Sequence, residues 1–226
     1  MDIVLIAGLW LEKSIWNEVC VELERLGHNP IPVALPGVDD GAAGATLEDQ
    51  VAAVLDAIDQ AERPVVVGHS AACGLAWIAA DQRPDAVEKV ALIGGFAPAA
   101  GEKYADFFEI ADGLMGFPGW EPFEGPDSAD LDEATKARIS ANAVPVPARV
   151  ARGVVALANE RRYDVPIFII CPEFSPDQAQ AWIGAGDVPE LAKARDLEFI
   201  DIDSGHWPMV SQPVKLAEIM DGIAKG

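Results

Sequence analysis

The residues best suited to do chemistry surround Ser70. Three β-branched residues, Val65 to Val67, lead directly into Gly68-His69-Ser70, and small residues follow. This pattern predicts a strand, a tight turn and a helix, in which the turn exposes the serine hydroxyl and the helix N-terminus faces it. An ordinary connection with Ser70 as the helix N-cap is the alternative. A phosphate-binding loop is disfavoured, because its lysine and its GxxxxGK[ST] spacing are absent.

A nucleophilic serine needs a base, and the chain has 3 histidines. His28 lies in a Gly-His-Asn-Pro turn. His69 is the neighbour of Ser70 and should point away from it at a strand end, so we interpret it as a packing residue. His206 remains, directly after the last predicted strand. Ser70 and His206 together indicate catalysis in which a serine attacks and an imidazole moves its proton.

An imidazole base is usually oriented by a carboxylate, and three acids are candidates for that role. Glu173 and Asp177 both follow the apolar run 165–171, whereas Asp203 lies three residues before His206. Glu173 ranks first because it leaves a strand end and has the longer side chain. Asp177 ranks second because it is also suited to cap the helix that begins near residue 176. Asp203 ranks last, because so close a neighbour has difficulty reaching the far ring nitrogen.

The elements that must position these residues follow an alternating pattern. Short β-rich apolar runs alternate with helix-length segments, which is typical of a parallel sheet covered on both faces. We predict strands at 2–7, 30–34, 64–68, 88–94, 165–171 and 197–202. We predict helices at 13–26, 46–62, 71–82, 176–194 (broken near Gly184 and Gly186) and 212–224.

Residues 97–160 interrupt this alternation. The stretch has no good strand pattern, is rich in glycine and proline, and shows short helical patterns near 103–112, 130–142 and 147–159. An insertion of this length predicts a helical cap rather than a structureless loop. We therefore expect one domain, 1–226, with the cap inserted within it.

The serine segment resembles the nucleophile elbow of the α/β-hydrolase family, whose pattern is GxSxG. Gly68 and Ser70 match the pattern, and Ala72 replaces its last glycine. His206 also stands where that family keeps its base, after the last strand. The resemblance implies a mostly parallel six-stranded sheet with helices on both faces, lacking the first two strands of the family, and a small helical cap.

The same resemblance implies further site residues. An oxyanion hole would use the backbone N–H of Ala71 and that of Leu9, in a loop where Gly8 matches the family's His-Gly-x motif and Ala7 replaces its histidine. Residues 165–177 resemble the family's strand followed by G-E-x-D, with Ser175 where the catalytic Asp belongs.

The layout looks like the small-cap branch that holds methylesterases, hydroxynitrile lyases and bacterial serine esterases. The lyases carry a threonine in the first-strand loop and a lysine after the catalytic histidine, where this chain has Gly8 and Trp207. Both departures favour ester hydrolysis through an acyl-enzyme. We expect Gly8, Trp10, Trp120 and Trp207 to line an apolar substrate pocket. A non-catalytic binding protein for a small hydrophobic signal molecule and a cofactor-free lyase remain alternatives.

The net charge is −21, which disfavours nucleic acid and anionic membranes as partners. The 3 cysteines are an odd number without CxxC or zinc-type spacing, and each lies in an apolar stretch, so a reducing cytoplasm fits best. The apolar start of the chain lacks the basic region of a signal peptide, and we read it as a strand. No cofactor or metal is expected. The expected partner is a small-molecule ester, and the sequence leaves open whether two copies form a homodimer.

Overall fold

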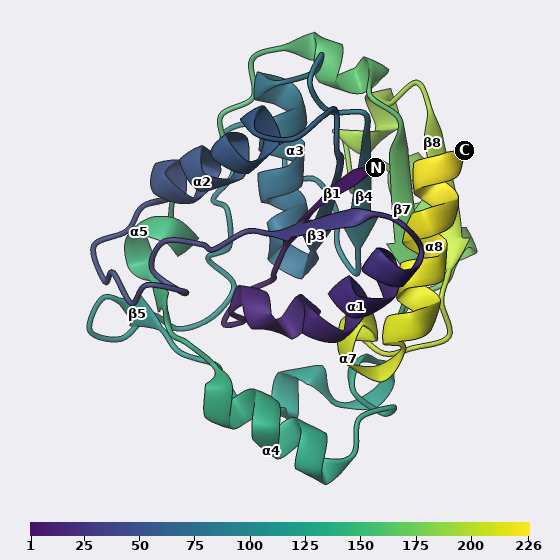
Figure 1. The fold of residues 1–226 in the computed structure, drawn as a ribbon. Coiled ribbons are helices and arrows are strands. Elements are labelled where there is room, and N and C mark those ends of the chain that lie inside the picture. Colours follow the sequence, from purple (N-terminus) through teal and green to yellow (C-terminus); the bar gives the residue numbers. More distant parts are fainter.

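The computed structural model describes residues 1–226 and is built around a six-stranded sheet (Figure 1). The strand order is β2-β1-β3-β4-β7-β8, and every pairing is parallel. The bounds are β1 Asp2–Ile6, β2 Asn29–Pro32, β3 Val65–His69, β4 Lys89–Ile93, β7 Ile167–Cys171 and β8 Leu197–Asp201. All six predicted strands are confirmed, with ends shifted by at most two residues.

Helices cover both faces of the sheet, as predicted (Figure 1). One face carries α1 (Asn17–Arg25) and α8 (Pro213–Lys225), and the other carries α2 (Leu47–Asp59) and α3 (Cys73–Gln82). Side chains of a strand alternate between the faces. Ile3 and Leu5 of β1 therefore pack with α1 and α8, whereas Val4 and Ile6 pack with α2 and α3.

The order of the strands reverses at β1. From β1 the chain goes outward to β2 and then returns to the other side of β1 as β3. The loops that leave the carboxyl ends of β1 and β3 therefore diverge, and such a switch point is where open α/β sheets bind ligands.

The remaining elements are short. The α-helices are α4 Glu133–Asn142, α5 Ala148–Ala151, α6 Pro176–Ala185 and α7 Pro208–Ser211. The 3₁₀ helices are η1 Lys13–Trp16, η2 Ser70–Ala72, η3 Glu121–Phe123, η4 Gly125–Asp127, η5 Glu160–Asp164 and η6 Leu191–Lys193. A separate antiparallel pair joins β5 (Leu114–Met115) to β6 (Val146–Pro147). No helix has both the length and the apolar character needed to cross a membrane.

Residues 97–160 differ in part from the sequence prediction. Helix α4 occupies the predicted 130–142 region, and it stands beyond the end of the sheet (Figure 1). The helix predicted near 103–112 is absent, and the one near 147–159 is reduced to α5. The reason is tertiary: Tyr104 and Ala105 donate backbone hydrogen bonds to the carbonyls of Gly153 and Ala151, next to an isolated antiparallel bridge between Lys103 and Val154, so these N–H groups are not used within a helix.

The helix predicted at 176–194 breaks as expected near Gly186, whose φ of 89° ends α6. Its N-cap differs from the expectation. Ser175, not Asp177, caps α6, and Gln178 completes a capping box with it. Asp177 is an exposed residue of the first turn.

Candidate active site

Ser70 lies on a strained turn between β3 and α3. Its φ is 56°, a left-handed value that few residues other than glycine adopt. The turn is also tight: a Cβ on Gly68 would lie 2.4 Å from the carbonyl oxygen of Ala72, and one on Gly95 would lie 2.7 Å from that of Ser70. Ala72 has an ordinary φ of −67°, so an alanine replaces the motif's last glycine without backbone strain. The geometry matches the predicted elbow.

His206 and Glu173 form a close pair near the serine. Nδ1 of His206 lies 2.7 Å from Oε1 of Glu173, and both side chains are largely buried. A carboxylate only accepts, so Nδ1 carries a proton, and in the neutral imidazole Nε2 then keeps a free lone pair. Oε2 of Glu173 is buried without a hydrogen-bond partner. Asp177 and Asp203 are exposed, and neither bonds to His206.

The backbone around His206 is held from three sides. Its N–H donates to the carbonyl oxygen of Asp127 at 2.7 Å, and its own carbonyl lies 2.7 Å from Nε2 of His69. The N–H of Gly205 donates to the Asp130 carboxylate, also at 2.7 Å. Asp127 and Asp130 belong to the segment 97–160, so this segment positions the histidine loop. The sequence analysis missed both, because no local pattern reveals a contact over such separations.

Two ionisable groups beside His206 have shifted pKa values. Burial, together with the positive charge of a protonated His206, lowers the pKa of His69 to about 3. His69 is therefore neutral near pH 7, and its Nε2–H donates to the His206 carbonyl. Burial also raises the pKa of Asp127, the negative charge of Glu173 raises it further, and His206 partly opposes both. His69 is buried, as expected of a packing residue, but it also lines the cavity and holds the backbone carbonyl of His206.

The loop after β1 approaches Ser70 from the other side of the switch point. A Cβ on Gly8 would lie 2.7 Å from Nδ1 of His69 and 3.2 Å from Cβ of Ser70, so only glycine fits there. Leu9 follows, and its N–H has no hydrogen-bond partner within the protein. Ala71 directly follows Ser70 in η2. These are the two backbone positions expected to provide oxyanion donors.

Ser70 and His206 line one cavity of about 200 Å³. No hydrogen bond joins them in the structure, and such bonds often tighten only when substrate binds. The rest of the lining is mostly aromatic or aliphatic. It consists of Leu9, Trp10, His69, Phe107, Phe108, Phe123 and Trp207.

The expected pocket residues divide into two groups. Trp10 and Trp207 line the cavity, whereas Gly8 and Trp120, which were also expected there, are not among its lining residues. Trp120 packs edge-on against Trp207, with ring centroids 5.1 Å apart, and donates its indole N–H to the Ser140 hydroxyl at 2.8 Å. The three phenylalanines of the lining come from the segment 97–160 and were not predicted.

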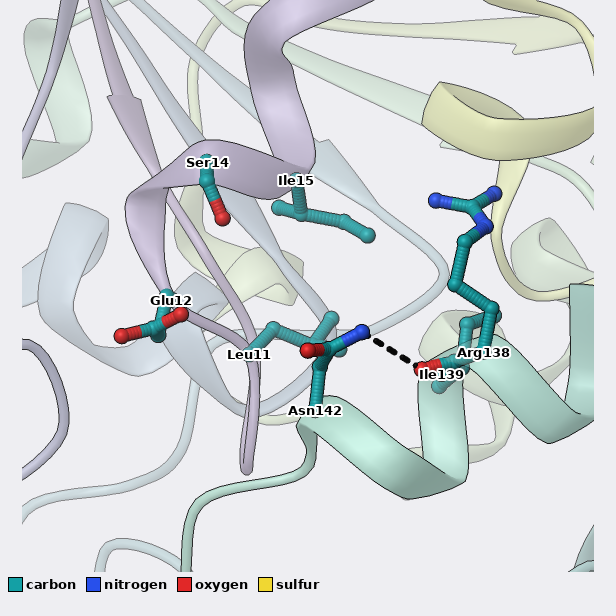
Figure 2. Close-up of a pocket in the computed structure, with 7 residues that line it drawn as sticks. All are labelled: Leu11, Glu12, Ser14, Ile15, Arg138, Ile139 and Asn142. Atoms are coloured by element: carbon teal, nitrogen blue, oxygen red, sulfur yellow. Dashed lines mark hydrogen bonds between the residues drawn. The ribbon is translucent and has the colours of Figure 1, made fainter.

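A separate pocket of about 180 Å³ lies between the loop after β1 and helix α4 (Figure 2). It contains the hydroxyl of Ser14 and the guanidinium of Arg138 but no histidine. It therefore lacks a nucleophile–base pair. No group of three or more His, Cys, Asp or Glu side chains is arranged to hold a metal ion.

Similar folds occur among solved structures. An extracellular α/β-hydrolase from a Paenibacillus species, described as sharing structural and functional homology with tobacco salicylic acid binding protein 2, has a TM-score of 0.80 at 22% identity, with 97% of each chain covered. Methylesterase MES16 from Arabidopsis has a TM-score of 0.77 at 14% identity, with 100% of this chain and 99% of that one covered. A pyrethroid hydrolase from Sphingobium faniae gives 0.73 at 19%, covering 100% and 98%.

These identities are low, so the likeness establishes the fold rather than a substrate. A search of curated protein sequences found no match. A family model, by contrast, matches almost the whole chain, from residue 3 to residue 219. The chain belongs to the alpha/beta hydrolase family.

Proposed function

We propose that the protein is a serine hydrolase that cleaves a small hydrophobic carboxylic ester through an acyl-enzyme. The observation that carries the proposal is the 2.7 Å contact between His206 and Glu173 in the wall of the cavity where the strained turn presents Ser70. The family match and the hydrolases among the structural neighbours support it.

The reaction would proceed in two stages. Oγ of Ser70 attacks the ester carbonyl carbon while Nε2 of His206 takes its proton, and the N–H groups of Leu9 and Ala71 stabilise the oxyanion. The tetrahedral intermediate collapses, and the leaving alcohol receives the proton from Nε2. Water then gives a proton to Nε2 and attacks the acyl carbon. Release of the acid returns the proton to Ser70. Glu173 would hold the Nδ1–H tautomer throughout.

The cavity limits the substrate. A cavity of about 150 Å³ lined by apolar side chains holds a benzene molecule. At about 200 Å³, this cavity has room for one aromatic ring or a short alkyl chain beside the ester. The cavity lining contains no Asp, Glu, Lys or Arg side chain, and the buried His69 stays neutral. We therefore propose an uncharged acyl or alkyl group rather than a second carboxylate.

The proposal also covers the role of residues 97–160, the cellular location and the kind of substrate. Residues 97–160 would act as the cap, because they supply Phe107, Phe108 and Phe123 to the cavity. The three free cysteines support a cytoplasmic location. The net charge of −21 supports a small-molecule substrate rather than nucleic acid or an anionic membrane.

The test compares wild type, Ser70→Ala and Ser14→Ala, the last a serine from the separate pocket. Wild type and Ser14→Ala should hydrolyse p-nitrophenyl butyrate and react with a fluorophosphonate probe, with the adduct on the Ser70 peptide. Ser70→Ala should do neither. Equal rates in wild type and Ser70→Ala, with both folded, would reject the hydrolase in favour of a binding protein. A lyase would instead label at Ser70 without hydrolysing esters.

A further inference from the structure

Trp10 has an unusual backbone conformation beside the proposed oxyanion donor Leu9. Its φ is 64°, and a bulky residue seldom adopts this left-handed region unless its surroundings impose it. Two hydrogen bonds do so. The carbonyl of Trp10 accepts from the N–H of Val144 at 2.9 Å, and its indole Nε1–H donates to the carbonyl of Met115 at 3.0 Å. The side chain is 5% exposed.

The two partners of Trp10 lie in or next to the small β5–β6 strand pair. Met115 lies in β5 and pairs with Val146 of β6, and Val144 lies two residues before that strand partner. The β5–β6 pair closes the base of the loop 116–145. That loop carries Phe123 of the cavity wall and the two aspartates that hold the backbone of the histidine loop.

No other hydrogen bond joins the loop 7–16 to residues 97–160. Beyond Trp10 the loop and α4 line the pocket of Figure 2, where the hydrogen bond drawn, from Asn142 to Arg138, stays within α4. Trp10 is therefore the single hydrogen-bonded anchor between the loop after β1 and this segment. Its ring also packs against Phe108 and Phe117, at centroid distances of 5.3 and 5.4 Å.

We infer that Trp10 is a positioning residue, whose two hydrogen bonds, to Met115 of β5 and to Val144 just before β6, aim the Leu9 N–H at the oxyanion. The inference rests on the proposed function. If the inference holds, the segment 97–160 positions both the oxyanion donor Leu9, through Trp10, and the proposed base His206, through Asp127 and Asp130. A wall residue would affect substrate binding, whereas a positioning residue affects charge stabilisation in the transition state.

The experiment removes the indole N–H and keeps a ring. In Trp10→Phe, kcat should fall about tenfold, a smaller loss than the ~10²–10³ seen when an oxyanion donor is deleted. Any rise in KM should be smaller than the fall in kcat and reflects the smaller ring in the cavity wall. The Ki of an aryl trifluoromethyl ketone, whose hemiketal oxygen occupies the oxyanion hole, should rise by the factor by which kcat/KM falls. Phe108→Leu is the matched control: it alters the cavity wall without touching a hydrogen bond, so its loss should appear mainly in KM.

A second variant covers the case in which Trp10→Phe fails to fold. Benzothienylalanine at position 10 keeps the shape of tryptophan and replaces its N–H with sulfur, so it should reproduce the kcat and Ki changes. If the wild type is active and the variants change only in KM, or do not change at all, the inference is overturned and the proposed hydrolase function stands. A wild type that neither turns over ester nor labels at Ser70 would instead overturn the proposed function, and this inference with it.

Discussion

His69 makes the stability of this protein depend on pH in a way that one substitution should reveal. The imidazole is 1% exposed between β3 and the His206 loop, and its pKa is lowered to about 3 by burial and by the neighbouring His206. In the unfolded chain the same group has a pKa of about 6.5. Between these values the unfolded state binds one proton more than the folded state, so acidification favours unfolding.

The size of the effect follows from that gap. Each pH unit between the two pKa values costs about 1.36 kcal/mol of unfolding free energy per proton. From pH 7.5 to pH 5.0, protonation of His69 in the unfolded chain should therefore remove about 2 kcal/mol. For a chain of this length, that corresponds to a Tm difference of roughly 4–8 °C.

The variant His69→Gln removes the titrating group, and its amide retains a donor for the His206 carbonyl. The assay is urea unfolding of both proteins at pH 7.5 and pH 5.0, followed by circular dichroism. The carboxylates titrate in both proteins and cancel in the comparison. We expect the acid-induced loss in the variant to be smaller by about 2 kcal/mol, whatever its stability at pH 7.5. An equal loss in both proteins would show that His69 takes up its proton in the folded state, and would refute the argument.

Two further predictions concern the acid and the turn. Glu173→Gln should lower kcat by about two to four orders of magnitude with the fold intact, because it removes the carboxylate that accepts from Nδ1. Asp177→Asn should change kcat by less than about twofold. Steady-state kinetics that reverse this order would assign the acid to Asp177. Gly68→Ala places a Cβ 2.4 Å from the Ala72 carbonyl oxygen. It should lower the free energy of unfolding by about 1–3 kcal/mol and should also lower the activity. The control is Gly184→Ala in α6, where the new Cβ meets no atom within 4 Å. This variant should raise the free energy of unfolding by about 0.5–1 kcal/mol, as measured by thermal unfolding. Equal melting temperatures for the two variants would contradict the packing argument.

The sequence by itself determined the sheet and the centre of the site. Strand residues such as Ile3 and Val4 face opposite layers because the side-chain period of a strand is fixed by its backbone. The turn at Ser70 was readable because Gly68 and the small residues after it are a local requirement of close approach. Glu173 could be ranked above Asp177 because Glu173 lies two residues after the end of a strand, and parallel strands bring their carboxyl ends to one edge of the sheet.

Only the tertiary structure decided how these residues are held. Asp127 and Asp130 hold the His206 loop from more than seventy positions away in the chain, and the strand pair that anchors Trp10 joins Met115 to Val146. The backbone hydrogen bond from Tyr104 to Gly153 likewise replaced the helix that the local pattern predicts. In these contacts a backbone N–H donates either to a backbone carbonyl or to a carboxylate. A hydrogen bond between two backbone groups is compatible with almost any side chain at either residue. No residue type or spacing therefore marks them, and they exist only once the chain has folded.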